Sequence, residues 1–491
     1  MPARDRSLPW FAGVVNSPTP LPRSTPDSQG VSARGLAEFV TALDAAVAHP
    51  HSVMVMRHGT VIAEGWWAPY AATLPHMMFS VSKSFTAMAV GLAIVEGRLS
   101  VDDRVIELLR DDAPAAPSPH LAAMRVRDLL TMTAGHATES LPPVWRLGDR
   151  SWAAAILDHP VEHEPGTRFV YNSGASYLLA AIVQRVTGER MLDYLTPRLL
   201  EPLGIAGAQW QQSPQGIDTG GWGLSITTED LARFGQFLLQ RGEWNGRQLV
   251  PREWIETATS AVVSNAPAGG ATESDWSMGY GYQFWQCRHG AYRADGAFGQ
   301  FCVVLPEQDA VLVLTGGYED MQAALAVAWS TLLPAFEGAD PDATRTAAEL
   351  TALLSTLSIP APPPAEPATL RVEVEPNEWE VRHVTIDADH IRFDGRFGTR
   401  TMAFGEGVWM PGSTTLHGAV RDIPELASVR IQSAAAWLSP THWRGQMILV
   451  ETPFLQTLDI VVDGDSASLT LTQNVSFRGP DIAQLAGRVE R

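Results

Sequence analysis

The sequence predicts an α/β fold for residues 36–338, followed by a smaller all-β domain. Three observations support this prediction. Strand-like apolar runs occur at residues 53–65 and 279–316, and helical patterns fill the stretch between them. A Pro/Ala/Glu-rich stretch at residues 360–367 is typical of a stiff linker. Beyond it, short strand-like runs dominate. We therefore expect one sheet assembled from the two ends of the first region, with a helical domain inserted between them.

The first region opens with a hairpin pattern and continues with an apolar helical pattern. Residues 53–65 place apolar runs on both sides of a turn at His58-Gly59. Residues 80–96 carry apolar side chains at three- and four-residue spacing, and Gly97 is a typical helix stop. Further helices are expected at residues 125–133, 151–158, 174–187, 191–200, 228–241, 251–258 and 319–333, and further strands at residues 279–287, 289–295, 299–305 and 310–316.

These patterns divide the chain into four parts. Residues 1–35 are expected to be a flexible lead-in, since prolines interrupt them and they lack the apolar stretch of a signal peptide. Residues 36–338 form the first domain, and residues 339–367 contain a helix and the Pro-rich linker. Residues 368–491 are expected to form a small antiparallel β domain, either a barrel or a sandwich. Its clearest strands are expected at residues 370–374, 383–386, 390–393, 429–431, 447–450, 458–462 and 468–472.

Composition narrows the classes of partner. The chain has 35 basic and 54 acidic residues and a formal net charge of −19, which argues against nucleic acid as a partner. No apolar run reaches the roughly 18–20 residues that a membrane span requires, so no membrane association is expected. The two cysteines are too few for a disulfide framework or a four-cysteine zinc site. A cytoplasmic protein without metal or cofactor is the expectation.

The chain contains a single lysine, Lys83, and all its other basic residues are arginine. Lys83 follows Ser80 by three positions, so the two side chains share one face of the expected helix. A serine hydroxyl becomes a good nucleophile when a neighbouring base takes its proton. Lysine can be that base if burial lowers its pKa, whereas arginine stays protonated. The backbone N–H of Ser80, at a helix start, is also suited to bind an oxyanion.

Several motifs in order resemble the penicillin-recognising serine hydrolases, a group that includes class C β-lactamases, D-alanyl-D-alanine peptidases, esterases and amide hydrolases. The resemblance covers residues 36–334, and its first motif is Ser80-x-x-Lys83. It implies an antiparallel sheet flanked by helices with an inserted helical domain. Tyr171, in the second motif, would shuttle protons close to Ser80, with its pKa lowered by a neighbouring ammonium. The similar segments are residues 78–86, 99–105, 126–135, 164–173, 220–225 and 230–234.

Two positions depart from the usual family pattern. Ser173 stands where the second motif has asparagine; it could still hydrogen-bond the substrate, with a shorter reach. The third motif, often Lys-Thr-Gly or His-x-Gly, corresponds to the segment at residues 293–301 and has no lysine. Gly296 or Ala297 could supply the second oxyanion N–H, but no cation would meet a substrate carboxylate. Asp295 would repel such a group unless it points away.

The sequence therefore predicts a serine hydrolase that cleaves small esters or linear amides through an acyl-enzyme on Ser80. Trp222, in a glycine-rich loop, is expected to wall a substrate pocket. His159 and His163 are four residues apart, but Pro160 and Pro165 favour a loop over a metal site. The partner would be a small ester, amide or short peptide. Two alternatives remain: a D-amino-acid peptidase, transpeptidase or peptide cyclase, and a non-catalytic binding protein on the same fold.

Overall fold

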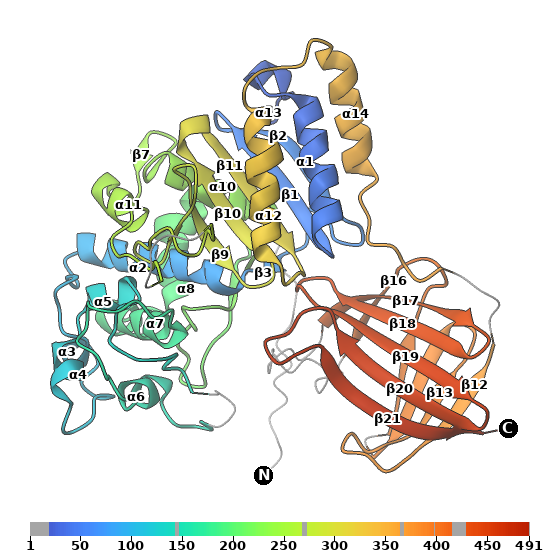
Figure 1. The fold of residues 1–491 in the computed structure, drawn as a ribbon. Helices are drawn as coiled ribbons and strands as arrows, with labels where there is room; N and C mark the ends of the chain where they lie inside the picture. The colour runs from blue at the N-terminus through green and yellow to red at the C-terminus, as the bar shows by residue number, and fades with distance from the viewer. Residues whose placement is uncertain are drawn as a thin grey trace.

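The structure is a computed structural model that describes residues 19–142, 147–267, 273–363, 368–396, 398–414 and 429–490. Its first domain is built on a six-stranded sheet in the order β2-β1-β11-β10-β9-β8 (Figure 1). All five strand pairings are antiparallel. The strands from the two ends of the region meet in one sheet, as predicted. They are β1 (Pro50–Arg57), β2 (Thr60–Trp66), β8 (Trp285–Gln286), β9 (Tyr292–Gly296), β10 (Gln300–Leu305) and β11 (Ala310–Gly316).

The middle residues of the central strands β1, β10 and β11 are apolar because both faces of this sheet are covered. On β1, Met54 and Met56 pack into the core on one face, and Val53 and Val55 pack into the core on the other. A strand buried on both sides has no polar face, so its residues do not alternate in polarity. The hairpin turn between β1 and β2 lies at His58-Gly59 as predicted, with φ values of 50° and 75° at these residues.

One face of the sheet is covered by helices from the two ends of the first region and by α14 of the segment that follows it, seen together in Figure 1. These helices and β1 enclose one hydrophobic core, which includes Phe39, Leu325 and Leu350. The second face is covered by α10 and α2 and by the inserted helical domain. The covering helices of the first face are α1 (Ala33–Ala46), α12 (Met321–Val327), α13 (Leu333–Ala335) and α14 (Ala343–Ser355).

The inserted domain is mostly helical, as predicted, with shorter helices at several places. The expected helix at residues 191–200 ends at Leu195 and continues as a π turn (Thr196–Leu200), and the one at residues 319–333 also passes through a π turn (Ala328–Leu332). The α-helices between β2 and β8 are α2 (Ser82–Val95), α3 (Val105–Leu108), α4 (Pro119–Ala123), α5 (Val126–Leu130), α6 (Trp152–Leu157), α7 (Ser173–Thr187), α8 (Met191–Leu195), α9 (Glu201–Leu203), α10 (Thr228–Leu239) and α11 (Arg252–Ala258).

Short elements complete the first domain. A three-stranded sheet joins β3 (His76–Met77), β5 (Leu224–Ile226) and β4 (Gln209–Trp210), and β6 (Glu243–Trp244) pairs with β7 (Arg247–Gln248). The strand expected at residues 279–287 is confined to β8 and an isolated bridge at Tyr280. Single 3₁₀ turns lie at Asp27–Gln29, Phe79–Val81 and Pro306–Gln308.

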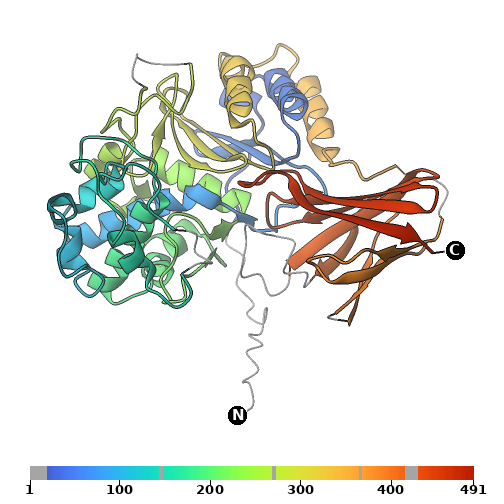
Figure 2. The same ribbon diagram turned by 60° about the horizontal axis from the view of Figure 1, so that its bottom comes forward.

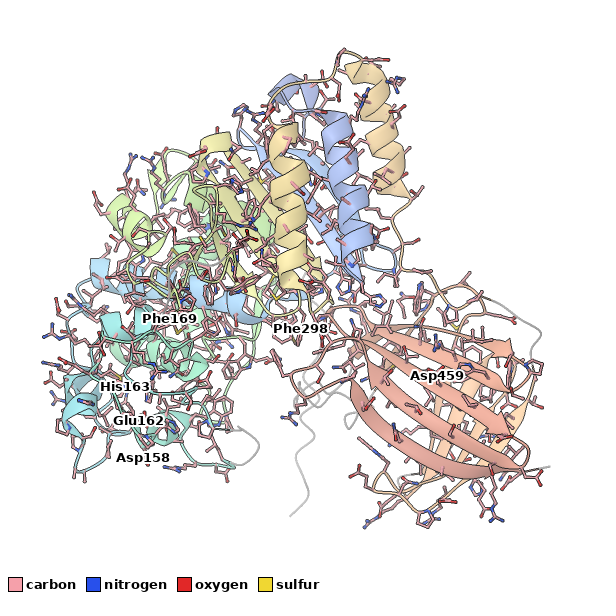
Figure 3. All side chains as sticks on the ribbon, in the orientation of Figure 1. Asp158, Glu162, His163, Phe169, Phe298 and Asp459 are labelled. Atoms are coloured by element: carbon pink, nitrogen blue, oxygen red, sulfur yellow. The ribbon has the colours of Figure 1, made fainter. Side chains whose placement is uncertain are left out.

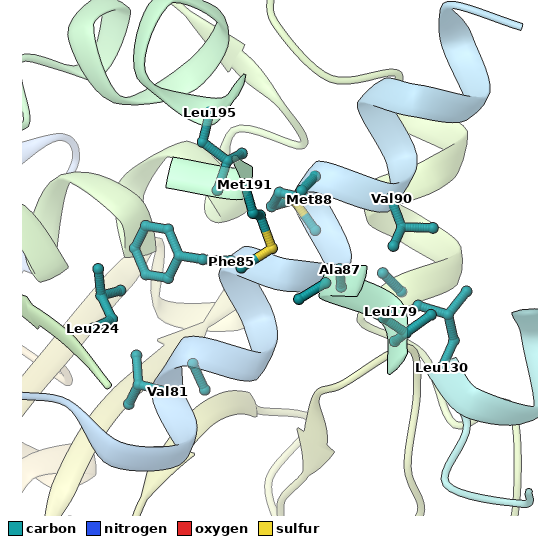
Figure 4. Close-up of a cluster of buried hydrophobic side chains, with 14 of the residues drawn as sticks. Val81, Phe85, Ala87, Met88, Val90, Leu130, Leu179, Met191, Leu195 and Leu224 are labelled. Atoms are coloured by element: carbon teal, nitrogen blue, oxygen red, sulfur yellow. The ribbon is translucent and has the colours of Figure 1, made fainter. Parts of the chain in front are cut away.

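The central helix of this domain, α2, is buried almost along its whole length. Figure 4 shows Phe85, Met88 and Met191 packed together around it. Phe85 stacks on Phe234 of α10 at a centroid distance of 3.9 Å. Burial of a large apolar side chain stabilises the fold by about 1.5–3 kcal/mol. The core therefore fixes the position of the helix that carries Lys83.

Residues 19–32 differ from the flexible lead-in expected for residues 1–35. Leu21 and Val31 are buried, and Arg23 forms ion pairs with Glu64 and Glu229. Apolar side chains and a paired arginine hold this part of the segment on the first domain, and residues 1–18 lie outside the described ranges. Within the 339–367 segment, α14 is the expected helix, while the linker residues 364–367 lie outside the described ranges.

The C-terminal domain is one ten-stranded antiparallel sheet in the order β15-β14-β13-β12-β21-β20-β19-β18-β17-β16. Its edge strands β15 and β16 lie close to each other, so the sheet curls into a near-barrel beside the first domain (Figure 2). This decides between the expected barrel and sandwich. The strands are β12 (Leu370–Val374), β13 (Val381–Ile386), β14 (His390–Gly395), β15 (Gly398–Ala403), β16 (Met410–Thr414), β17 (Val429–Ser439), β18 (His442–Leu449), β19 (Leu455–Asp463), β20 (Ser466–Gln473) and β21 (Asp481–Val489).

Candidate active site

Ser80 lies in a 3₁₀ turn (Phe79–Val81) that leads directly into α2, so the α-helix begins two residues later than expected. Phe79 has a φ of 46°, in the left-handed region that non-glycine residues rarely adopt. The hydroxyl of Ser82 donates a 2.6 Å hydrogen bond to the Phe79 carbonyl and accepts one of 3.1 Å from the Leu224 N–H. Ser82 therefore ties the turn that carries Ser80 to strand β5.

Lys83 is buried beside Ser80, with a side chain that is 1% exposed. Its Nζ lies 3.1 Å from Ser80 Oγ, 3.2 Å from Ser173 Oγ and 2.8 Å from the carbonyl oxygen of Gly221. Burial lowers the pKa of Lys83 to about 8, although the carboxylates of Glu139 and Asp295 act in the opposite direction. This burial meets the condition that the sequence argument set for Lys83 to act as a base.

Tyr171 packs against the same lysine, which lies 4.8 Å from the centre of its ring. Trp285 covers the tyrosine ring at a centroid distance of 5.2 Å. Burial raises the pKa of Tyr171 above its ordinary value of 10, and a hydrogen bond to Ser80 opposes this shift only in part. The lowered pKa expected for Tyr171 is wrong, because loss of solvent disfavours the phenolate more than its neighbours favour it. Tyr171 is a neutral phenol in this site.

Ser173 is the first residue of α7 and joins the second motif to the lysine. Asn172 caps the helix by accepting a hydrogen bond from Ala175 N–H at 3.2 Å. Glu139 accepts the N–H groups of Ser173 at 2.7 Å and Gly174 at 3.1 Å, which places a carboxylate at the positive end of α7. Glu139 was not identified from the sequence, because its contact with α7 spans a loop with no motif of its own.

The end of β9 approaches the backbone that precedes Ser80. A Cβ on Gly296 would lie 2.2 Å from the Met78 carbonyl oxygen, so only glycine permits this approach. Ala297 follows it and is half-buried. Asp295 is 8% exposed and accepts a 2.7 Å ion pair from Arg293 Nε on the same strand. Burial raises the pKa of Asp295, with Arg293 and Lys83 acting against the rise. Asp295 is therefore engaged by an arginine of its own strand.

Trp222 belongs to a tight segment, residues 219–223, that crosses over Lys83. Its ring is half-buried and stacks on Trp152 at 6.1 Å, and its carbonyl accepts a 2.8 Å hydrogen bond from Trp210 Nε1. The preceding residue, Gly221, supplies the carbonyl that binds Lys83. The Gly220-Gly221 pair was the only sequence signal for this contact, since Gly220 has a φ of 64° and packs against α7.

Among the described residues, no cluster of three or more histidine, cysteine, aspartate or glutamate side chains could hold a metal ion. His163 and His159 lie in the loop between α6 and α7. His163 Nε2 accepts a 2.8 Å hydrogen bond from Arg168, and the ring of His159 lies 5.6 Å from that of His136. In the same parts of the chain, every helix is too short or too polar to cross a membrane. The structure thus brings Ser80, Lys83, Tyr171 and Ser173 together, with Gly296 against the nucleophile turn.

The fold and this cluster define a class of serine hydrolase, and comparison with known proteins identifies the family. Residues 36–347 match the family described as Beta-lactamase, and the chain belongs to this family. It is similar to the 6-aminohexanoate-dimer hydrolase of Paenarthrobacter ureafaciens, with 28% identity over 286 residues that cover 54% of this chain and 72% of that protein.

Two solved structures share the fold. One is a candidate 6-aminohexanoate-dimer hydrolase from Bacillus anthracis, with a TM-score of 0.51 and 22% identity over 65% of this chain and 88% of that one. The other is a candidate β-lactamase from Bacteroides dorei, with a TM-score of 0.51 and 17% identity over 61% of this chain and 97% of that one. At these identities, both resemblances concern the fold alone.

Proposed function

We propose that the protein cleaves small esters or linear amides through an acyl-enzyme on Ser80. The observation that carries this proposal is the buried Lys83 Nζ at 3.1 Å from Ser80 Oγ, with its pKa lowered to about 8. In its neutral form, Lys83 can take the proton of the Ser80 hydroxyl as oxygen attacks the substrate carbonyl carbon. The chain has no second lysine that could replace it.

The oxyanion that forms on the substrate would be bound by two backbone N–H groups. One belongs to Ser80, in the turn before α2, and the other to Gly296 or Ala297 at the end of β9. The close approach of Gly296 to Met78 supports this assignment, because it holds the two backbone segments next to each other. The proton on Lys83 then passes to the leaving alcohol or amine as the carbon–oxygen or carbon–nitrogen bond breaks. Water hydrolyses the acyl-enzyme by the reverse proton path.

Tyr171 would assist as a neutral phenol. Its raised pKa means that it donates a hydrogen bond and relays a proton without forming a stable phenolate. Ser173, 3.2 Å from Lys83, would orient the amine and contact the substrate. Trp222 is proposed as a wall of the same pocket, next to the Gly221 carbonyl.

Small esters and linear amides are favoured over β-lactams by the third motif. Arg293 is the cation on this strand, and it is bound to Asp295 instead of being free to meet a substrate carboxylate. The family relative named for hydrolysis of the 6-aminohexanoate dimer, a linear amide, supports the same class. Action on D-amino-acid peptides, as a peptidase, transpeptidase or cyclase, is the second candidate, which the same Ser80–Lys83 arrangement would serve.

Covalent labelling tests the proposal and separates it from a non-catalytic binding protein. We expect a fluorophosphonate probe to modify Ser80, as located by peptide mass mapping, and Ser80→Ala to abolish the label. A panel of esters, linear amides and D-peptides then ranks the substrate classes. Wild-type protein that stays unlabelled and turns over none of the panel would support the binding protein. Turnover confined to D-peptides would support the second candidate.

A further inference from the structure

Two loops of the C-terminal near-barrel reach the residues next to the candidate active site. In the β18–β19 loop, the Glu451 carbonyl accepts a 2.8 Å hydrogen bond from Met77 N–H, and the Thr452 carbonyl accepts one of 3.0 Å from Tyr70. At the start of the β20–β21 loop, Asn474 donates a 2.8 Å hydrogen bond to the Gly317 carbonyl. These contacts hold the β18–β19 loop against the segment that leads into Ser80, and the β20–β21 loop against the residue that follows β11.

Four phenylalanines meet at this junction. Phe79 directly precedes Ser80, and Phe298 directly follows Ala297; their rings are perpendicular, with centroids 5.4 Å apart. Phe454 of the β18–β19 loop lies 6.3 Å from Phe79 and 6.2 Å from Phe298. Phe477 of the β20–β21 loop lies 4.7 Å from Phe298 and 6.1 Å from Phe79. Figure 3 shows Phe298 where the first domain faces the near-barrel.

Two residues of this aromatic cluster have strained backbone conformations. Phe79 and Phe298 both have positive φ values, 46° and 67°. Bulky residues avoid this region, and it persists where surrounding contacts over-determine it, often at ligand sites. Both strained residues adjoin the backbone groups proposed to bind the oxyanion, and both rings pack in one hydrophobic cluster with residues of the C-terminal domain. The loops of that domain are therefore held next to the backbone proposed to bind the oxyanion.

Phe477 differs from the other three rings in its exposure. Phe79, Phe298 and Phe454 are buried, whereas Phe477 is 66% exposed. An exposed phenyl ring gains no hydrophobic stabilisation from the face it leaves in water. Its ring packs against Phe298, which follows Ala297, and its exposed surface is therefore available to an apolar group on a molecule bound at Ser80.

We propose that Phe477 is a specificity-determining residue contributed by the C-terminal domain, and that it binds an aliphatic or aromatic substituent of the substrate. This inference rests on the proposed hydrolysis at Ser80 and adds the substrate class: esters or amides with an apolar chain on one side of the scissile bond. The near-barrel then acts as part of the substrate site through its β20–β21 loop.

Chain-length selectivity tests this inference. In Phe477→Ala, we expect kcat/KM for long-chain esters to fall about five- to tenfold, mainly through KM, while short esters such as 4-nitrophenyl acetate are unaffected. Phe477→Leu should recover most of the loss. Two ester series are needed, one extending the acyl chain and one extending the alcohol. Loss confined to the long members of either series supports the inference, and equal loss or no loss across both overturns it.

Leu438→Ala is the matched control. Leu438 is a 38% exposed apolar residue of the same domain, near the end of β17 opposite to Val429, which packs in the Phe79 cluster. Its removal should leave the selectivity unchanged. Calorimetric titration of Ser80→Ala and Ser80→Ala/Phe477→Ala with N-hexylacetamide and with N-methylheptanamide, which extend the two sides of the amide, measures the same site without turnover. Five- to tenfold weaker binding of either amide by the double variant supports the inference even if hydrolysis at Ser80 fails, and equal binding of both amides, or no binding of either, overturns it.

Discussion

The amine nitrogen of Lys83 lies closer to the carbonyl oxygen of Gly221, at 2.8 Å, than to the hydroxyl oxygen of Ser80, at 3.1 Å. A neutral amine can donate its hydrogens to Gly221 and to Ser173, which leaves its lone pair for Ser80. The Gly221 carbonyl thus orients the base as well as satisfying it. Arginine at this position would bring a permanent positive charge and no lone pair.

Replacement of the lysine should separate activity from stability. We expect Lys83→Arg and Lys83→Met each to lower kcat by about 10²–10⁴-fold, since the general base is lost. At pH 7, the free energy of unfolding of Lys83→Met should nevertheless be about 2 kcal/mol higher than that of the wild type, because the variant no longer buries an ammonium group. Ester turnover and chemical denaturation of both variants measure the two effects. Near-normal turnover by Lys83→Arg would contradict the assigned role.

The pH dependence follows from the same group. The unfolded chain protonates Lys83 near pH 10.5 and the folded chain near pH 8, so between these values the unfolded state binds the extra proton. Wild-type stability should therefore rise with pH across this window relative to Lys83→Met, by up to about 3 kcal/mol. Activity should rise as pH increases toward 8 and then level off, because the base works unprotonated. Paired calorimetry and kcat/KM profiles check both; an activity pKa near 10.5 would contradict them.

Gly296→Ala should damage both the fold and the reaction. Its Cβ would lie 2.2 Å from the Met78 carbonyl oxygen and 2.9 Å from the Gln300 Cβ, so β9 and the nucleophile turn would be forced apart. We expect a loss of about 1–3 kcal/mol in the free energy of unfolding, with kcat falling more than KM changes. Gly338→Ala is the control, because a Cβ there meets nothing within 4 Å. Equal kcat values in the two variants would argue against an oxyanion role for the β9 end.

Ser82→Ala should slow catalysis by releasing the turn around Ser80. The substitution leaves the buried N–H of Leu224 without its partner, which costs about 1–3 kcal/mol. We expect kcat to fall about tenfold with KM nearly unchanged, since the nucleophile loses its position. Ser84→Ala is matched, because Ser84 is also buried on α2 and its hydroxyl donates to the Gln283 carbonyl at 2.8 Å. Ser84→Ala should lose a similar free energy of unfolding and keep its kcat. If kcat falls equally in both variants, the role of Ser82 is structural only.

Local sequence patterns were sufficient to predict those parts of the site that lie within one helix or strand. The three-residue spacing of Ser80 and Lys83 is a property of a helical turn, and the apolar character of α2 indicated burial of the lysine. The two-ended sheet was also readable, because β1 and β11 are apolar runs flanking a helical region. By contrast, the direction of the Tyr171 pKa shift was predicted wrongly, since burial depends on neighbours such as Trp285 that are distant in sequence.

By itself, the sequence determined the Ser–Lys pair, the order of the two domains and the loss of a lysine-bearing third motif. Those conclusions depend on residue types and on short spacings along the chain, and both can be read directly from the sequence. Only the tertiary structure decided that Gly221 holds the lysine, that Arg293 engages Asp295, and that Phe477 of the near-barrel lies against Phe298. Each of these contacts joins backbone or rings brought together by chain packing, and packing geometry leaves no trace in the spacing of residues along the chain.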